Sequence, residues 1–169
     1  MTDPDPGRTD IMSAEARSRL MARIGGRNTK PEVTLRKALF RLGFRYRLHP
    51  RDISGRPDMV FPRWRAVVFV HGCFWHGHDC HLFRWPKGNA EFWQAKIAGN
   101  VERDRRTLDA LVAQGWRVLT VWECAMRGTA GLPPGELAAA AARFLISPDP
   151  KVRSAELKHQ IAVPPEPAS

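Results

Sequence analysis

The feature that most constrains this chain is a run of metal-ligand residue types directly after an apolar segment. Residues 71–81 read HGCFWHGHDCH and hold two cysteines, four histidines and an adjacent aromatic pair, Phe74 and Trp75. The residues before them, 66–70, are all apolar, which indicates a buried β-strand. Because a rigid strand fixes the point where the following loop begins, we expect the chemistry of this chain to lie at the end of that strand.

The composition predicts one folded domain. A length of 169 residues suffices for one hydrophobic core, and 43% hydrophobic residues with six tryptophans favour a globule over disorder. No apolar run approaches the roughly 20 residues of a membrane span, and the acidic N-terminus is unlike a signal peptide. We therefore expect a cytoplasmic protein, in which three cysteines are explained by a metal site more easily than by disulfides.

The net charge of +10 is confined to the first half of the chain. Between Ser13 and Arg65 there are 14 Lys or Arg residues against 4 Asp or Glu, whereas the other residues carry 13 of each sign. Basic side chains displace the counterions condensed on phosphates, so nucleic acid is the leading partner for this half. The alternative is a basic solvated face of an enzyme with another substrate.

The order of apolar patterns predicts a mixed α/β domain over residues 13–146. We expect a flexible leader over residues 1–12 and a disordered, Pro-rich tail over residues 147–169. The expected helices cover about residues 13–24, 29–42, 89–114 and 134–146. The expected strands cover residues 44–49, 57–61, 66–70 and 116–122, and the second and third form a hairpin. Asp104 interrupts the apolar stripe of the helix 89–114, so we expect it to face inward.

The cysteines indicate a structural metal centre. Cys73, Cys80 and Cys124 with one histidine would form a Cys₃His set, which closes a tetrahedral zinc shell without an open position. Because two of the cysteines lie in one loop and the third ends a later strand, the ion would fix that loop to the sheet. The spacing leaves the fourth ligand open among His78, His76, His81 and Asp79. The alternative is buried free cysteines beside surface histidines.

The same region holds the candidate catalytic residues. Asp58 opens an apolar strand, where it could bind a hard cation such as Mg²⁺ or simply close a turn. His71 and His76 follow the partner strand, so a hairpin would bring them near Asp58 to take a proton from water or contact a phosphate. Asp104 could orient such a histidine, or form a buried salt bridge with a neighbouring arginine. Glu32 could touch the site, although the helix dipole alone favours an acid at a helix start.

Several short motifs occur in a fixed order along residues 13–128. They are Pro57-Asp58, HGCFWHGHDC at 71–80, EFW at 91–93, NVERDRR at 100–106, GWRVL at 115–119 and VWEC at 121–124. Together they resemble the very-short-patch mismatch-repair endonucleases (Vsr). The resemblance implies a restriction-endonuclease-like fold of the PD-(D/E)xK superfamily, a mixed central sheet flanked by helices with a structural zinc site. It also implies a Mg²⁺-dependent nick on the 5′ side of the thymine in a T:G mismatch, which arises when 5-methylcytosine deaminates.

The resemblance further implies roles for individual residues. Mg²⁺ would be held by Asp58 and by the backbone carbonyl of Val70. His76 would be the general base, with His71 assisting at the phosphate and with Glu32 and Asp104 supporting the site. The zinc ligands would be Cys73, His78, Cys80 and Cys124. The DNA would be contacted by the wedging aromatics Phe74, Trp75 and Trp93, by Met21 of a basic N-terminal helix (residues 13–27), and by Lys96 and Asn100.

Aromatic side chains can act as such a wedge, because a mismatched base step is easier to unstack than a Watson–Crick step. Their alternative role is core packing, and Trp93 also fits the apolar stripe of its helix. The chain lacks the acid and lysine of broader nucleases of this fold, since positions 68, 70 and 72 are Val, Val and Gly. Val70 stands where relatives can have threonine, and a backbone carbonyl ligand would be unaffected by that change.

The expected function is therefore a DNA mismatch endonuclease that acts as a monomer in the cytoplasm, at the nucleoid, on double-stranded DNA. A mismatch-repair coordinator protein is a possible further partner. Two alternatives stay open: a sequence-specific nuclease of the same fold, and a non-catalytic zinc-stabilised module that binds distorted DNA. The preferred flanking sequence does not follow from the chain.

Overall fold

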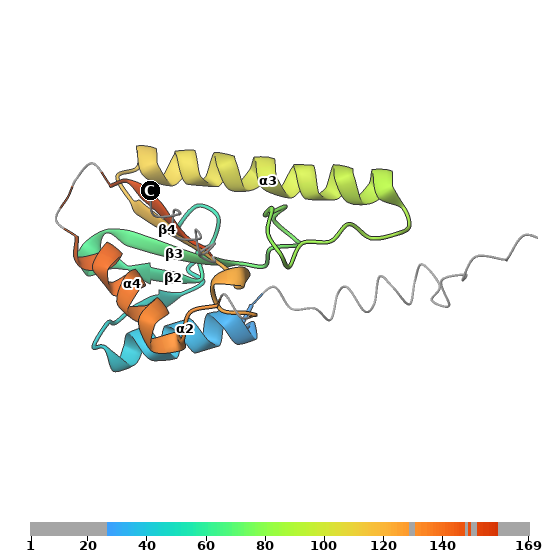
Figure 1. The fold of residues 1–169 in the computed structure, drawn as a ribbon. Coiled ribbons are helices and arrows are strands. Elements are labelled where there is room, and N and C mark those ends of the chain that lie inside the picture. The colour runs from blue at the N-terminus through green and yellow to red at the C-terminus, as the bar shows by residue number, and fades with distance from the viewer. Residues whose placement is uncertain (1–26, 129–130, 148, 150–151, 159–169) are drawn as a thin grey trace, which may run out of the picture.

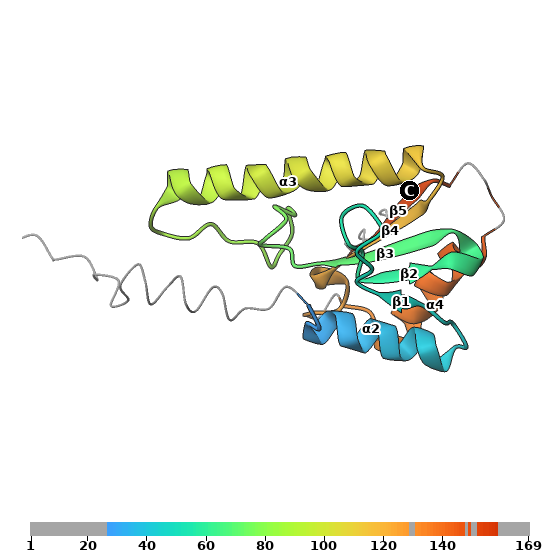
Figure 2. The same ribbon diagram turned by 180° about the vertical axis from the view of Figure 1, so that it is seen from behind.

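The computed structural model describes residues 27–128, 131–147, 149 and 152–158. The expected helix at 13–24, and with it Met21, lies outside these residues. The expected mixed α/β architecture is confirmed: one five-stranded sheet has helices on both faces (Figures 1 and 2). Among the described residues no helix combines the length and apolar character needed to cross a membrane.

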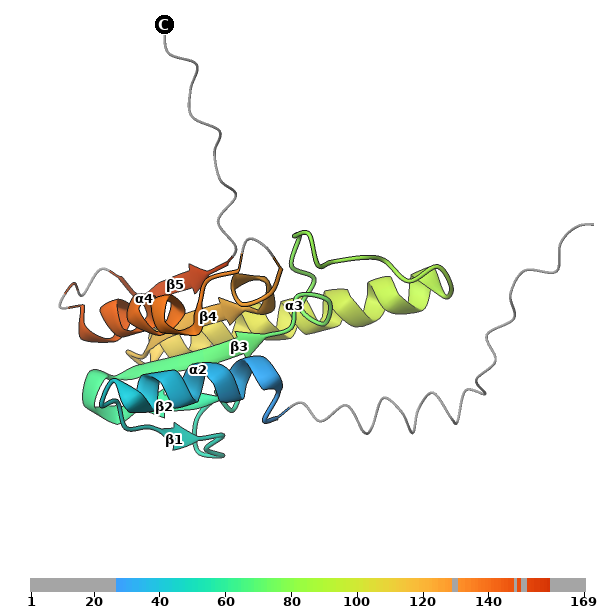
Figure 3. The same cartoon turned by 60° about the horizontal axis from the view of Figure 1, so that its bottom comes forward.

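The sheet has the strand order β1-β2-β3-β4-β5, which Figure 3 shows with the helices α2 (Lys30–Arg41) and α4 (Pro134–Ile146) in front. The strands are β1 (Arg47–Leu48), β2 (Met59–Phe61), β3 (Ala66–His71), β4 (Arg117–Trp122) and β5 (Ser154–Leu157). The first three pair antiparallel, whereas β3, β4 and β5 pair parallel. The predicted hairpin is β2–β3, closed by a 3₁₀ turn at Pro62–Trp64 and a left-handed Arg65.

Helices α2 and α4 lie on one face of the sheet and α3 (Ala90–Ala113) lies on the other (Figure 1). α2 (Lys30–Arg41) and α4 (Pro134–Ile146) pack with each other and with the inner side of β3 and β4, where Leu39, Val68 and Leu137 are fully or almost fully buried. α3 (Ala90–Ala113) covers the opposite face. Alternate residues of the central strands, such as Val67 and Val118, pack against it. A sheet buried on both faces explains why residues 66–70 are continuously apolar.

Local sequence signals set the helix ends. The Thr29 side chain accepts a hydrogen bond from the backbone N–H of Glu32 at 3.4 Å, and Pro31 occupies the first turn of α2. Gly115 follows the C-terminus of α3 with φ +80°, a left-handed conformation that glycine adopts without strain. Asn89 stands at the N-cap position of α3, but its side chain makes no capping hydrogen bond.

Strand directions bring three chain segments to one end of the sheet. β2 starts there because it runs antiparallel to β3, while β3 and β4 both end there, with His71 opposite Trp122. The N-terminal half of α3 extends past this end, and the segment between β3 and α3 runs beneath it (Figure 1). The residues that follow β3 are therefore enclosed between the sheet and α3.

Two expectations about the sheet edges were wrong. Of the expected strand 44–49, only Arg47–Leu48 pairs with β2, and both residues are exposed. The left-handed backbone of His49, followed by Pro50, ends the strand.

The expectation of a disordered tail over residues 147–169 was wrong for the part of it that forms a strand. Residues Ser154–Leu157 form β5, which pairs parallel with β4. Its apolar residues Ala155 and Leu157 pack on the core that α2 and α4 cover. Two apolar residues give too short a pattern to indicate a strand, because an edge strand is held largely by backbone hydrogen bonds that carry no sequence signal.

Candidate active site and metal centre

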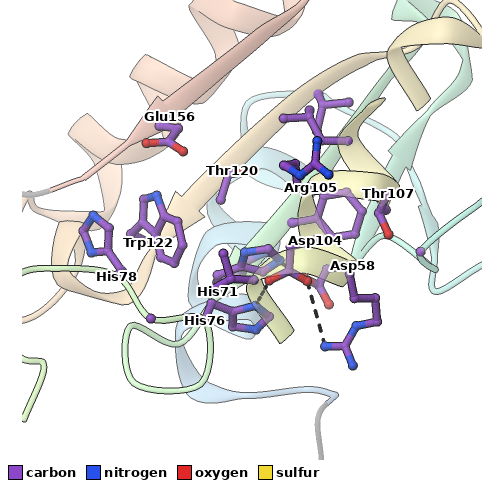
Figure 4. Close-up of a pocket in the computed structure, with 18 of the residues that line it drawn as sticks. Asp58, His71, His76, His78, Asp104, Arg105, Thr107, Thr120, Trp122 and Glu156 are labelled. Atoms are coloured by element: carbon purple, nitrogen blue, oxygen red, sulfur yellow. Dashed lines mark hydrogen bonds and ion pairs between the residues drawn. The ribbon is translucent and has the colours of Figure 1, made fainter. Parts of the chain in front are cut away.

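A groove of about 770 Å³ lies at the end of the sheet where β2 begins and β3 and β4 end. Asp58, His71, His76 and Asp104 all line it, and Figure 4 shows these side chains turned toward one another. Its wall also carries the cationic residues Arg56, Arg103, Arg105 and Lys158. The sequence thus predicted four residues that the fold brings into one groove, with positive charge around them.

Asp58 is placed by the strand pairing of the hairpin. It immediately precedes β2, and its Oδ2 atom accepts a hydrogen bond of 2.6 Å from the backbone N–H of Val70 near the end of β3. The pKa of Asp58 is raised to about 7, chiefly by burial and in part by the negative charge of Glu32, against the lowering effect of the Val70 hydrogen bond. A carboxylate under this strain is stabilised by a cation placed beside it.

The two predicted histidines stack on each other beside Asp104. The rings of His71 and His76 are 3.8 Å apart and almost parallel, at an interplanar angle of 3°. His76 Nδ1 lies 2.5 Å from Asp104 Oδ2, the contact drawn as a dashed line in Figure 4. An acceptor at Nδ1 fixes the proton on that nitrogen and leaves Nε2 as the basic one. Asp104 does face inward on α3, as expected.

His71 has a different electrostatic character from its neighbour. Burial lowers the pKa of His71 to about 3, and the adjacent His76 acts in the same direction. The ring is therefore neutral near pH 7. It can contribute a hydrogen bond within the groove, but no full positive charge.

The structure adds His49 to the site, which sequence reasoning missed. Glu32 is buried, with 1% of its surface exposed, and its Oε1 atom lies 3.1 Å from Arg36 Nη1 and 3.1 Å from His49 Nε2. The other ring nitrogen, His49 Nδ1, lies 3.6 Å from Asp58 Oδ1. His49 is a lone histidine at the end of a basic, alternating segment, without a motif around it. Only its proximity to Asp58 in the folded chain indicates that it belongs to the site.

A second cluster holds three cysteines and one histidine. The side chains of Cys73, His78, Cys80 and Cys124 each offer a ligand atom, and these atoms all lie within 4.8 Å of one another. His78 is the histidine of this set, whereas His76 belongs to the groove. The residues are sulfur and imidazole donors in the number that a tetrahedral ion requires.

Packing holds the cysteine cluster firmly. Cys73 and Cys124 are fully buried, and the Cys124 N–H donates to the Cys73 sulfur at 3.3 Å. His78 stacks on Trp122 at 4.2 Å between ring centroids. Burial raises the pKa of the Cys73 thiol far above its ordinary value, so without a cation this sulfur stays protonated. A bound metal ion would supply the charge that favours the thiolate.

The predicted wedge residues form an aromatic cluster beneath the first half of α3. Phe74 contacts Trp75 at 5.1 Å, Trp93 at 5.4 Å and Phe83 at 6.1 Å between ring centroids. All are half-buried, so they pack on one another and still reach the surface. Phe74, Trp75 and Phe83 lie on the segment that the cysteines join to the sheet, and Trp93 lies in the first turn of α3.

Contacts to α3 hold this segment from its other side. Asn100 Nδ2 donates to the Trp75 carbonyl at 2.8 Å. Gly77 has φ +61°, and a Cβ atom there would meet Ile97 at 2.9 Å, so only glycine allows this approach. Asn100 is therefore brought to the aromatic cluster. Lys96 is not in the groove: it is exposed, with its Nζ atom 6.0 Å from the centre of the Phe92 ring.

Comparison with known proteins identifies relatives of this chain. The family model described as DNA mismatch endonuclease Vsr matches residues 9–82. The type II nicking enzyme V.XorIIP of Xanthomonas oryzae is 49% identical over 116 residues, 69% of this chain and 85% of the relative. The DNA mismatch endonuclease Vsr of Escherichia coli is 47% identical over 119 residues, 70% of this chain and 76% of the relative. Among solved structures, the catalytic domain of the homing endonuclease I-Bth0305I aligns with a TM-score of 0.46 and 19% identity, over 71% of this chain and all of that domain.

Proposed function

Because this chain belongs to the Vsr family of DNA mismatch endonucleases, and is thus an endonuclease of that type acting on DNA, we propose that it nicks one strand at T:G mismatches. The cut lies 5′ of the thymine and begins very short patch repair of deaminated 5-methylcytosine. The observation that carries the proposal is the groove in which Asp58, His71, His76 and Asp104 meet. Relatives named as mismatch endonuclease and as nicking enzymes support it.

Asp58 is the residue that would hold a catalytic Mg²⁺, together with the carbonyl oxygen of Val70. The fit is good on the carboxylate side, since Asp58 lines the groove and is buried enough to raise its pKa to about 7. Oxygen donors are also those that Mg²⁺ prefers. When bound there, Mg²⁺ supplies polarisation of the scissile phosphate and stabilisation of charge on the leaving 3′ oxygen.

His76 takes the proton of the attacking water on Nε2. Asp104, at 2.5 Å from Nδ1, holds the ring in the tautomer that this step requires and stabilises the imidazolium that forms. His71, neutral and stacked on His76, donates a hydrogen bond to a phosphate oxygen and limits the rotation of the His76 ring. The arginines of the groove wall attract the DNA backbone.

The aromatic cluster distinguishes mismatched from paired DNA. Phe74, Trp75 and Trp93 enter the base stack beside the mismatch, which costs a few kcal/mol per unstacked step and less at a wobble pair. Zinc bound by Cys73, His78, Cys80 and Cys124 keeps their segment rigid, so that this cost is not increased by ordering a loop.

The test is a nicking assay on matched duplexes that differ only in a T:G or T:A pair. We expect a single nick in the T:G duplex with Mg²⁺, leaving 3′-hydroxyl and 5′-phosphate ends, and none in the T:A duplex. His76→Ala should lose nicking while it still binds the DNA. Equal cutting of both duplexes would contradict mismatch specificity, and binding of T:G DNA without any cut would indicate a recognition module instead.

A further inference from the structure

His49 lies between two carboxylates at the edge of the groove. Its Nε2 atom is 3.1 Å from Glu32 Oε1, and its Nδ1 atom is 3.6 Å from Asp58 Oδ1. The three side chains together offer ligand atoms within 4.8 Å of one another. All three are largely buried, with 2%, 12% and 15% of the side chains of Glu32, His49 and Asp58 exposed. Arg36 is paired with Glu32, so the remaining negative charge of Asp58 beside a buried imidazole favours a further cation.

Contacts within the protein do not satisfy the imidazole. The Nε2 atom is buried and, within the part of the chain that the structure describes, has no well-directed hydrogen bond, although Glu32 is near. The separation of 3.6 Å between Nδ1 and Asp58 exceeds a hydrogen bond. It is short enough for both atoms to reach one ion, since nitrogen and oxygen ligands lie about 2.0–2.2 Å from small divalent metals.

The two ring nitrogens face groups of different kinds. Asp58 lines the groove, from which an ion would enter, whereas Glu32 is buried behind it and already paired with Arg36. A metal-bound histidine commonly has a carboxylate next to its other ring nitrogen, which fixes the tautomer and makes the bound nitrogen more basic. Glu32 is the carboxylate near Nε2, although the two are not aligned for a hydrogen bond, and Nδ1 is the ring nitrogen near Asp58.

We infer that His49 is a nitrogen ligand of the catalytic divalent ion, binding through Nδ1 beside Asp58, with Glu32 as the residue that orients it. The inference rests on the proposed function in one respect, that Asp58 binds the ion. It assigns to the site a ligand from the β1–β2 connection, so that the ion joins this connection to the start of β2. It also gives buried Glu32 a positioning role without contact to the substrate.

The left-handed backbone conformation of His49 suits a histidine that the fold holds in a defined place. Its φ of +44° is uncommon outside glycine and is tolerated best by asparagine, aspartate and histidine. Because asparagine accepts this conformation, His49→Asn removes the imidazole without adding backbone strain. A second variant, His49→Gln, serves if the first does not fold.

The experiment uses Mn²⁺ as a paramagnetic substitute for Mg²⁺, since both favour carboxylate ligands. Mn²⁺ is added to the full-length, zinc-loaded protein, and electron spin-echo modulation is recorded with natural and ¹⁵N-histidine-labelled protein. We expect modulation from one directly bound imidazole nitrogen, which changes on labelling. His49→Asn should lose it and bind Mn²⁺ about tenfold more weakly, the lower end of what a supporting group of a metal site contributes. Thermal unfolding confirms that the variant is folded.

Two control variants assign the signal. His76→Ala should keep the nitrogen modulation, because its ring belongs to the cluster with His71 and Asp104. If His76→Ala loses the modulation and His49→Asn keeps it, the inference is overturned. Asp58→Ala should abolish Mn²⁺ binding at this site.

The Asp58→Ala control also separates two claims: that Asp58 binds the ion, and that His49 is a further ligand. Unchanged Mn²⁺ binding in Asp58→Ala would show that the ion lies elsewhere, which overturns the assignment of Asp58 as its ligand together with this inference, whereas the nicking assay tests the proposed function separately. Binding that requires Asp58 but shows no imidazole nitrogen would overturn the inference alone, and would leave His49 as a bridge between two carboxylates.

Discussion

The carboxylates Asp58, Glu32 and Asp104 occupy three different surroundings, and their chemistry differs accordingly. Asp58 is buried beside another acid, so its charged form is disfavoured unless a cation is present. Glu32 has a partner in Arg36 and is held away from the groove. Asp104 contacts His76 at a partly exposed position, with Arg103 3.9 Å away. One site can therefore hold an ion with Asp58 and orient a base with Asp104.

The charge of Asp58 has a consequence for stability that pH can reveal. Its pKa is about 7 in the folded, Mg²⁺-free protein and near 3.8 when unfolded. The folded state therefore holds a proton that the unfolded state has lost, and this group's contribution to stability falls as pH rises from about 4 to 7. We expect the difference in unfolding free energy between Asp58→Asn and the unmodified protein to change in favour of the variant from pH 4 to pH 8, by on the order of 3 kcal/mol.

Urea unfolding of both proteins at pH 4 and pH 8, zinc-loaded and without added Mg²⁺, measures this difference. Comparison of the two proteins removes the contributions of all other titrating groups. If the variant and the unmodified protein differ in unfolding free energy by the same amount at pH 4 and at pH 8, the pKa of Asp58 is not raised in the folded state.

Asp104 should act on rate rather than on DNA affinity. Asp104→Asn keeps the size of the side chain, but its amide can present a donor to His76 Nδ1 and favour the wrong tautomer. We expect single-turnover nicking to slow by about 10²–10⁴-fold, the range of general-base catalysis, with unchanged binding of the T:G duplex. Asp109→Asn, an exposed acid on the same helix that pairs with Arg105, is the control for the loss of a negative charge nearby. Equal rates for Asp104→Asn and the unmodified enzyme would exclude His76 as the base.

At the scale of elements, the cysteine cluster connects the segment after β3 to the end of β4. Cys124 lies in the short 3₁₀ turn that follows β4, while the other three ligand residues lie between β3 and α3. We expect Cys124→Ala to lose stoichiometric zinc and to lower the unfolding temperature. A free energy loss of several kcal/mol is reasonable, because metal binding and ordering of this segment are coupled. Zinc content by atomic absorption and a thermal melt check the result, with His81→Ala, outside the ligand set, as control.

Asn100 connects α3 to the segment that carries Phe74 and Trp75, through a hydrogen bond to the Trp75 carbonyl. Loss of such a bond costs about 0.5–1.5 kcal/mol, so we expect Asn100→Ala to weaken binding of a T:G duplex by roughly two- to tenfold. Binding of the T:A duplex should change little, because it does not require the wedge. Gln94→Ala, an exposed amide on the same helix, is the matched control. If both duplexes lose affinity equally, Asn100 contacts DNA directly instead of holding the loop.

The sequence predicted those elements whose signals are local or periodic. The apolar run at 66–70, the caps of α2 and the inward position of Asp104 all followed from spacing, and the structure confirms them. β5 could not be predicted, since an edge strand is specified by backbone pairing with β4. His49 could not be predicted either, because its partners come from the start of α2 and from the residue before β2. Contacts between distant segments leave no pattern in either one.

At the scale of the whole molecule, the positive charge and the aromatic cluster serve different purposes in the proposed function. The surplus of 10 basic residues between Ser13 and Arg65 would attract any duplex, whereas the aromatic cluster would respond to a weakened base pair. Nonspecific affinity would bring the enzyme to DNA, and the cost of unstacking would then decide where it cuts. These two contributions can be separated, because only the first depends strongly on salt.

Arg56 tests this separation, since it lines the groove beside Asp58. Removing one phosphate contact lowers the slope of log K against log salt by about 0.9. We expect Arg56→Gln to show this decrease for T:G and T:A duplexes alike, with their affinity ratio unchanged, whereas Trp75→Ala should reduce the ratio and leave the slope intact. Arg106→Gln is the matched control, because that arginine is exposed and paired with Glu102 at 2.8 Å. A change of the T:G to T:A ratio in Arg56→Gln would mean that charge takes part in mismatch recognition, and that the two contributions are not independent.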